Sequence, residues 1–358
     1  MRDAQLLADK FAIANTLALH SRGVDRADYP LLRSAYVDDG GAVAYGFFTG
    51  PADAFCRIIT DAQKSGPVTM HRTSNIWIKV AGDSARSESY VVAYMESPAD
   101  GGGLQRMIGG RYLDRHQRSG GDWKIAHRTY VLDWNLNWPT TSSWPETDDA
   151  HFSPQGGHQG VDPGRTLLAS WNAAPSTPGD QSGMSTNLDA TLDGVISKQA
   201  IHELGMAYCR AVDRGDEALL RSLFHPDATV VSGVVNGGID EFAPAIVSII
   251  RGNLKSSFHS VANEWVKIDG DSAVGESYVT AFTLAGEGAD AAQTVSGGRY
   301  VDRYTRRDGQ WKISERVFVM DFNINQPSTA IFGEGPYEHL TLRGGFKPDD
   351  PVFGFWED

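Results

Sequence analysis

Two histidines and two aspartates recur at one fixed interval and could carry acid–base chemistry. Asp25 and His71 in the first half correspond to Asp213 and His259 in the second, since 213 − 25 and 259 − 71 both equal 188. A neutral imidazole accepts a proton near pH 7 when a carboxylate orients its other nitrogen and stabilises the imidazolium that forms. The sequence therefore predicts one catalytic His–Asp dyad in each half. The structural alternative is a polar cap at a helix end and a hydrogen-bonded buried histidine.

Residues around the two dyads extend the candidate site. Arg128 and Arg316 keep the 188-residue interval, and aromatic residues follow each of them at alternate positions. An arginine among aromatic side chains could stabilise a leaving group or a developing oxyanion. The alternative is a structural ion pair or cation–π contact. Tyr208 precedes the second dyad aspartate and His20 holds the equivalent place in the first half, so either could hydrogen-bond a substrate oxygen or act as an acid.

Further contacts to a substrate are predicted on the strands that carry the histidines and arginines. In a regular strand alternate residues share a face, which places Asn75, Trp77 and Lys79 on the face of His71. The predicted substrate contacts are His20, Asn75, Trp77, Tyr130, Trp134, Asn263, Trp265, Phe318 and Phe322. Four residues of the GGRYxDR blocks are interpreted mainly as sheet and interface structure: Tyr112, Asp114, Tyr300 and Asp302.

The 188-residue interval also relates long stretches of the chain. Residues 109–137, GGRYLDRHQRSGGDWKIAHRTYVLDWNLN, return at 297–325 as GGRYVDRYTRRDGQWKISERVFVMDFNIN. Two copies of one domain are therefore predicted, at residues 1–170 and 189–358. Each copy ends in an irregular tail that we expect to wrap a neighbour or cover a pocket. Residues 171–188, rich in Pro, Gly and Ser, are predicted to be a flexible linker.

Each half shows helices first and hairpin-connected strands afterwards. Helical spacing of apolar residues predicts helices over 4–21 and 198–212, and a short helix, a short strand and another helix follow in each copy. In the first half, alternation and turn residues then predict strands over 68–80, 85–96, 104–117 and 122–135. This order is typical of an α+β domain in which a curved antiparallel sheet packs against N-terminal helices.

Composition limits the classes of function. A net charge of −13 over 358 residues argues against a nucleic-acid partner. Cys56 and Cys209 do not correspond in the repeat, so we expect buried thiols and no disulfide. The first residues lack a secretory pattern and no apolar run suits a membrane span, so a cytoplasmic location without a membrane partner is expected. No metal-binding or nucleotide-binding motif is found, and we expect no metal and no cofactor.

Three stretches resemble the SnoaL-like families of the nuclear-transport-factor-like superfamily of cone-shaped α+β domains. They are YCRAVDRGDEALLRSLFHPDATV at 208–230, HSVANEWVKIDGDSAVGESYV at 259–279 and GGRYVDRYTRRDGQWKISERVFVMDF at 297–322, and the first half repeats all three more loosely. Enzymes that look like this include scytalone dehydratase, hexachlorocyclohexane dehydrochlorinase and bile-acid dehydratase; ketosteroid isomerase and polyketide cyclases are more distant. The resemblance implies that the two halves associate as an intramolecular pseudo-dimer, and further homo-oligomerisation is left open.

The resemblance also implies roles for the repeated residues. His71 or His259 would be the base, oriented by Asp25 or Asp213, and the two arginines would lie in the pockets. Tyr208 would hold the place of the dehydratase tyrosine, from which His20 departs. We therefore expect a cofactor-independent lyase acting on a hydrophobic, hydroxylated aromatic or polycyclic small molecule, by dehydration, a related elimination or aldehyde-releasing C–C cleavage. The alternatives are an isomerase or cyclase of the ketosteroid-isomerase type and a non-catalytic small-molecule-binding protein.

Overall fold

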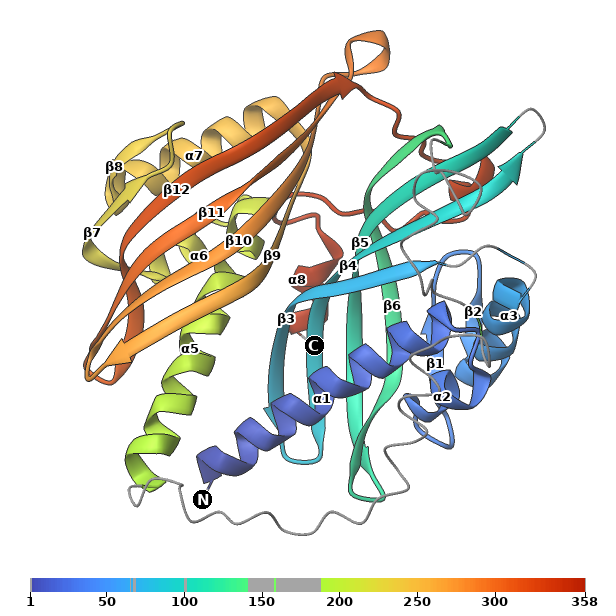
Figure 1. Ribbon diagram of the computed structural model, residues 1–358, viewed down its shortest axis with the longest axis horizontal. Coiled ribbons are helices and arrows are strands. Elements are labelled where there is room, and N and C mark those ends of the chain that lie inside the picture. The colour runs from blue at the N-terminus through green and yellow to red at the C-terminus, as the bar shows by residue number, and fades with distance from the viewer. Residues whose placement is uncertain are drawn as a thin grey trace, which may run out of the picture.

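The chain folds into two halves, each made of one six-stranded sheet with helices packed against it (Figure 1). The computed structural model describes residues 2–64, 66, 69–99, 102–140, 158 and 188–357. The predicted tandem α+β architecture is confirmed. Nearly all of the predicted linker, residues 171–188, lies outside the described residues, as does most of the first tail. Within the described part, no helix combines the length and apolar character that crossing a membrane requires.

The first half has the strand order β2-β1-β6-β5-β4-β3, in which only β1 and β6 run parallel. Its helices are α1 (Arg2–Asp25), α2 (Tyr29–Ser34) and α3 (Ala52–Lys64). Its strands are β1 (Ala42–Ala44), β2 (Thr49–Pro51), β3 (Met70–Ala81), β4 (Ser84–Ala99), β5 (Gly102–Ser119) and β6 (Asp122–Pro139).

The second half repeats this topology in the order β8-β7-β12-β11-β10-β9. Its helices are α5 (Leu188–Asp213), α6 (Glu217–Ser222) and α7 (Ile239–Asn253), with short helices η3 (Gly288–Asp290), η4 (Gly335–Tyr337) and α8 (Pro351–Glu357) in the connections and the tail. Its strands are β7 (Phe224–Val231), β8 (Asn236–Gly238), β9 (Leu254–Asp269), β10 (Ser272–Ala285), β11 (Ala292–Arg307) and β12 (Gln310–Pro327).

Local sequence explains where the helices that frame each pocket begin and end. Asp28 and Asp216 are the N-caps of α2 and α6, and each carboxylate accepts a hydrogen bond from the backbone N–H three residues later. The long helices α1 and α5 end at the two dyad aspartates. In each half the apolar residues of the helices and of one sheet face form a separate core.

A β-bulge in β3 changes which residues share a face. The pairing with β4 shifts between Ser74 and Trp77, and Asn75 has a left-handed φ of 47°. An extra residue in a strand reverses the alternation beyond it. His71 therefore faces α1, whereas Asn75 and Trp77 face the second half. The prediction that these three side chains share a face is wrong for this reason.

A second bulge, in β6, moves an aromatic residue out of the predicted pocket face. Gly109 pairs with Trp134 and Gly110 with Leu132, so β6 carries one extra residue between them. Trp134 stacks on Phe282 of the second half, with 3.9 Å between ring centroids. A Cβ atom on Gly109 would lie 1.9 Å from the indole nitrogen of Trp134, which explains the glycine. Trp134 therefore packs against the second half instead of lying on the face where the sequence analysis placed it.

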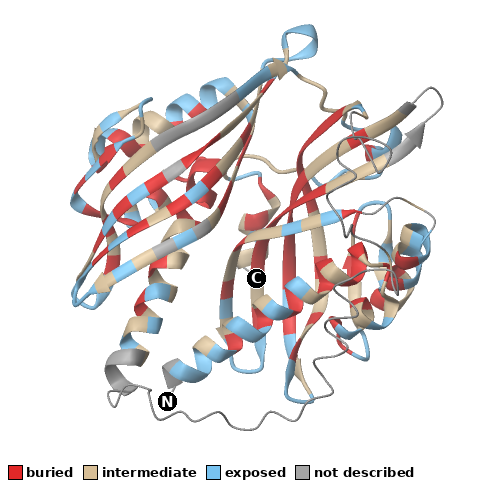
Figure 2. Cartoon of the chain, viewed as in Figure 1, coloured by how far each residue is buried: buried red, intermediate tan, exposed pale blue. Residues whose placement is uncertain are grey.

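The two halves are joined by the tail of the second half as well as by the sheets. The segment before α8 adds to the open edge of β6. The backbone N–H of Leu132 donates to the carbonyl of Leu342, and the N–H of Gly344 donates to the carbonyl of Leu132. Asp350 then accepts hydrogen bonds from Arg111 Nη2 at 2.6 Å and Arg214 Nη1 at 2.9 Å. All three side chains are buried, and Figure 2 shows buried residues along the strands beside α8. The contact forms an intramolecular pseudo-dimer.

Candidate active site

The second dyad has the geometry of a carboxylate-oriented base. Asp213, the last residue of α5, lies behind His259 of β9, with 2.6 Å between Asp213 Oδ1 and His259 Nδ1. The backbone N–H of His259 donates to Asp213 Oδ2 at 2.8 Å. Ser257 Oγ donates to Asp213 Oδ1 at 2.8 Å. The aspartate is fully buried, so these three donors hold it in a single orientation.

Electrostatics assign the protons of this pair. Burial raises the pKa of Asp213, but His259 and Arg214 outweigh that effect and hold the pKa below its usual value. The carboxylate is therefore ionised at neutral pH, and Nδ1 of His259 carries the proton that it donates. Nε2 makes no hydrogen bond with the described residues and is left to accept a proton.

The first dyad repeats this arrangement. His71 Nδ1 lies 2.6 Å from Asp25 Oδ1, and the backbone N–H of His71 donates to Oδ2 at 2.8 Å. Thr69 Oγ1 donates to Asp25 Oδ1 at 2.7 Å, in the place that Ser257 holds in the second half. The sequence analysis missed the two hydroxyl residues, although they also lie 188 positions apart.

A buried arginine faces the second dyad. Arg316 on β12 makes a bidentate pair with Asp302, with Nε–Oδ1 at 2.8 Å and Nη2–Oδ2 at 2.6 Å. Its guanidinium lies 4.0 Å from the ring centre of Tyr208 and 4.2 Å from that of Tyr300. Burial lowers the pKa of Arg316, but Asp302 raises it further and the net pKa is well above its usual value. The remaining nitrogen, Nη1, is buried without a hydrogen-bond partner among the described residues.

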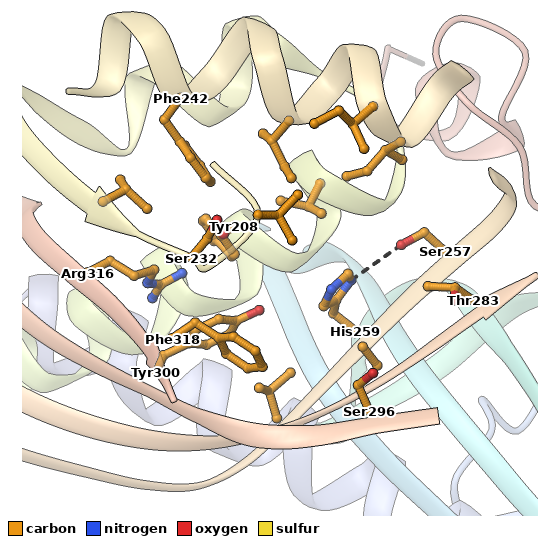
Figure 3. Close-up of a pocket in the computed structure, with 18 of the residues that line it drawn as sticks. Tyr208, Ser232, Phe242, Ser257, His259, Thr283, Ser296, Tyr300, Arg316 and Phe318 are labelled. Atoms are coloured by element: carbon orange, nitrogen blue, oxygen red, sulfur yellow. Dashed lines mark hydrogen bonds between the residues drawn. The ribbon is translucent and has the colours of Figure 1, made fainter. Parts of the chain in front are cut away.

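These groups line a mostly apolar cavity of about 250 Å³ under α7. Figure 3 shows His259 and Arg316 on opposite sides, with Phe242 above and Tyr300 and Phe318 below. Tyr208 also lines it; burial raises its pKa to about 12 despite the opposing effect of Arg316, so its phenol stays protonated. The other lining residues are Val212, Val230, Val231, Ser232, Val234, Ile246, Ile249, Ile250, Leu254, Ser257, Val279, Ala281, Thr283 and Ser296.

The first half keeps the arginine but changes its surroundings. Arg128 makes a bidentate pair with Asp114, with both contacts at 2.7 Å, and lies 3.8 Å from the ring centre of Tyr112. His20, which replaces Tyr208, lies 3.1 Å from the hydroxyl of Tyr36 through Nε2. Burial, Arg128 and the dyad histidine all lower the pKa of His20 well below its usual value. His20 is therefore a neutral side chain.

A tyrosine of the first half stands where the second half has a serine. Ala44 pairs with residue 129 and Val231 with residue 317, so the residues that follow, Tyr45 and Ser232, are structurally equivalent. The ring of Tyr45 lies 4.5 Å from that of Phe55 and 5.7 Å from that of Tyr130. In the second half the small side chain of Ser232 lines the cavity instead. The two halves therefore differ at this position: a buried tyrosine ring in the first half stands where a serine lines the cavity of the second.

The structure separates the candidate residues into two groups. The cavity of the second half brings together Tyr208, His259, Arg316 and Phe318, with Asp213 behind the histidine. The equivalent positions of the first half are Asp25, His71, Arg128, Tyr130 and His20.

The other candidates lie elsewhere or outside the described side chains. Asn75 hydrogen-bonds the backbone of β9, and Trp77 packs 5.9 Å from Trp356 of α8. Three candidate side chains are not described: Asn263, Trp265 and Phe322. The sequence analysis underestimated two residues: Tyr300, which lines the cavity, and Asp302, which pairs with Arg316. Among the described residues no group of three His, Cys, Asp or Glu side chains is placed to bind a metal ion.

Solved structures similar to this chain each match about one half of it. One is a candidate scytalone dehydratase from Novosphingobium aromaticivorans DSM 12444, at 20% identity over 40% of this chain and 99% of that chain, with a TM-score of 0.35. Another is a type-3 hexachlorocyclohexane dehydrochlorinase from Novosphingobium barchaimii LL02, at 24% identity over 41% and 99%, with a TM-score of 0.36. No curated protein matches the chain. The profile of the SnoaL-like domain matches twice, at residues 5–129 and 193–317, and the chain therefore belongs to the SnoaL-like domain family.

Proposed function

We propose that this protein is a cofactor-independent lyase that eliminates water or a comparable leaving group from a hydrophobic, hydroxylated aromatic or polycyclic small molecule. One observation carries the proposal. Nε2 of His259, oriented by the ionised Asp213, faces Nη1 of Arg316 across an apolar cavity, and neither nitrogen is used by the described residues. A base and a cationic donor on opposite sides of one cavity suit a reaction that removes a proton at one position and releases an oxygen at another.

The proposed reaction divides the steps between named atoms. His259 Nε2 takes a proton from carbon, and the electron pair of that C–H bond forms the new double bond. The C–O bond on the adjacent carbon breaks, and Arg316 Nη1 and the phenol of Tyr208 stabilise the departing oxygen. Asp213 stabilises the imidazolium, which then gives its proton to the departing hydroxide so that water leaves. The dyad is restored without an external reactant.

The surroundings of the two groups support this chemistry. Apolar side chains make up most of the cavity wall, and charge interactions are stronger where water is excluded. Phe242, Tyr300 and Phe318 offer ring surfaces to an aromatic or polycyclic framework. The dyad and arginine of the first half are arranged in the same way, and we propose the same chemistry there for a smaller substrate, because Tyr45 takes up part of the space.

The test uses a panel of β-hydroxy carbonyl compounds on aromatic and polycyclic frameworks. Product masses are measured for the wild type, His259→Gln, His71→Gln and the double variant. We expect a product lighter by one water and a loss of about 10²-fold or more in turnover for the variant of the half that is active. The matched control is His202→Gln, because His202 pairs with Glu264 outside the cavity and should leave turnover unchanged.

Other outcomes distinguish the remaining functions. A product of unchanged mass identifies an isomerase or cyclase, and a released aldehyde identifies C–C cleavage. Binding without turnover across the panel identifies a binding protein. A folded double variant with full activity would show that the dyads are not catalytic.

A further inference from the structure

A second large cavity lies between the two halves, on the reverse side of the sheets from the dyads. Its volume is about 630 Å³, within the range of sites for drug-sized ligands. Strands β3 to β6 form one wall and β9 to β12 the other. The lining residues are Met70, Arg72, Val92, Tyr94, Met107, Leu136, Trp138, Ser260, Thr280, Phe282, Val295, Ile324 and Gln326.

The lining residues are related by the internal repeat. Twelve of the thirteen form six pairs that are each 188 positions apart. The pairs are Arg72 with Ser260, Val92 with Thr280, Tyr94 with Phe282, Met107 with Val295, Leu136 with Ile324, and Trp138 with Gln326. The cavity therefore lies on the pseudo-two-fold axis and is created by the association of the halves. Neither half alone could form it.

The two walls differ in chemistry. Arg72 is the single charged residue among the described lining residues, and the equivalent position on the opposite wall is Ser260. Its side chain is exposed and makes no ion pair or hydrogen bond with the described residues. Aromatic rings stand on the same wall: Gln105 fixes two of them by donating to the hydroxyl of Tyr94 at 2.8 Å and accepting from the indole N–H of Trp138 at 2.7 Å.

The apolar part of the cavity is open to solvent. Met70 is 56% exposed and Ile324 is 52% exposed, although both line the cavity. Apolar surface gathered in a concave site with an unpaired cation beside it is typical of a site for an amphipathic anion. A planar anionic group such as a carboxylate matches the guanidinium of Arg72.

We propose that this interface cavity binds a small amphipathic aromatic anion. Its ring system lies between Tyr94 and Trp138 on one wall and Phe282 on the other, and its carboxylate or sulfonate pairs with Arg72. The site is separate from the proposed catalytic cavity and does not depend on that function. It lies directly behind the dyad strands, because Arg72 follows His71 and neighbouring strand residues face opposite sides.

The probe for the test is 8-anilinonaphthalene-1-sulfonate, an aromatic anion whose fluorescence rises in apolar sites. The folded wild-type protein should bind it, and Arg72→Gln should weaken binding by about fivefold at low salt, with a smaller effect at high salt. Val295→Trp should remove binding by filling the cavity. Arg303→Gln is the matched control, because Arg303 is exposed and pairs with Glu315, and it should bind as the wild type does.

The dye could enter the catalytic cavity, so one further variant separates the two sites. Ser232→Tyr narrows the catalytic cavity and should leave dye binding unchanged. Loss of binding in Ser232→Tyr together with full binding in Arg72→Gln would overturn the proposal, as would failure of the wild type to bind. Circular dichroism checks that each variant is folded. If Val295→Trp does not fold, Arg72→Gln against Arg303→Gln still decides the result.

Discussion

Replacing Asn75 with glycine should destabilise the contact between the two halves. Asn75 is buried in the bulge of β3, and its side-chain amide faces the free edge of β9. Nδ2 donates to the carbonyl of His259 at 2.6 Å, and Oδ1 accepts from the N–H of Val261 at 2.9 Å. The amide thus satisfies an edge strand as the peptide group of a neighbouring strand would.

The magnitude follows from the two backbone groups that lose their partner. A buried donor or acceptor left unsatisfied costs about 1–3 kcal/mol, so two such groups suggest a loss of about 2–6 kcal/mol. Glycine adds about 0.5–1 kcal/mol through the greater freedom of the unfolded chain, while it accepts the left-handed φ of this position. The total is a large share of the roughly 5–15 kcal/mol by which domains are stable.

Urea unfolding measures the free energy, and a matched variant isolates the role of the amide. Asp308 also has a left-handed φ, 52°, but it is exposed in the turn between β11 and β12. Asp308→Gly should therefore change the free energy of unfolding by less than about 1 kcal/mol. If Asn75→Gly is as stable as the wild type, or if Asp308→Gly loses as much, the amide does not hold the halves together.

Further predictions concern the pockets and two ion pairs. Tyr45→Ser should open space in the first pocket at a cost of about 2–4 kcal/mol, with xenon binding as the readout. Burial raises the pKa of Asp350, but Arg111 holds it far below 3.8. The ion pair therefore stabilises the folded protein above pH 3.8, and this stabilisation is lost only in strong acid. Asp350→Asn should lower the free energy of unfolding at pH 7. Burial lowers the pKa of His202, but Glu264 raises it above 6.5; His202→Gln should cost less than about 1 kcal/mol near pH 5 and nothing near pH 8.

The dyads could be predicted from the sequence because both partners lie where the repeat keeps its interval. Each aspartate ends a helix and each histidine lies near the start of a strand, and no insertion separates the copies there. The fold class followed from the order of helices and hairpins for a similar reason. Such features depend on local periodicity and on spacing, which a single sequence shows directly.

The errors arose where one residue is inserted into a strand. The bulge at Asn75 and the extra residue of β6 before Trp134 each reverse the alternation, and neither is visible in an apolar pattern that continues through it. The difference between the halves at Tyr45 and Ser232 was hidden by a similar one-residue shift. The 188-residue interval pairs Tyr45 with Gly233, whereas the strand register makes Ser232 its equivalent. A change of one residue in the preceding loop therefore concealed that Tyr45 and Ser232 are equivalent.

Covalent linkage of the two copies explains why such differences can accumulate. In a symmetric homodimer every interface residue appears twice, so a cation at the position of Arg72 would face its own copy across the axis. Here the opposite position is Ser260, and the single guanidinium can serve one anion. The same freedom lets one pocket keep Ser232 while the other has Tyr45. If the two copies act on different molecules, the double variant Tyr45→Ser and Ser232→Tyr should exchange the sizes of substrate that the two dyads accept. If both copies act on one shared substrate, the size preference of each dyad should stay unchanged.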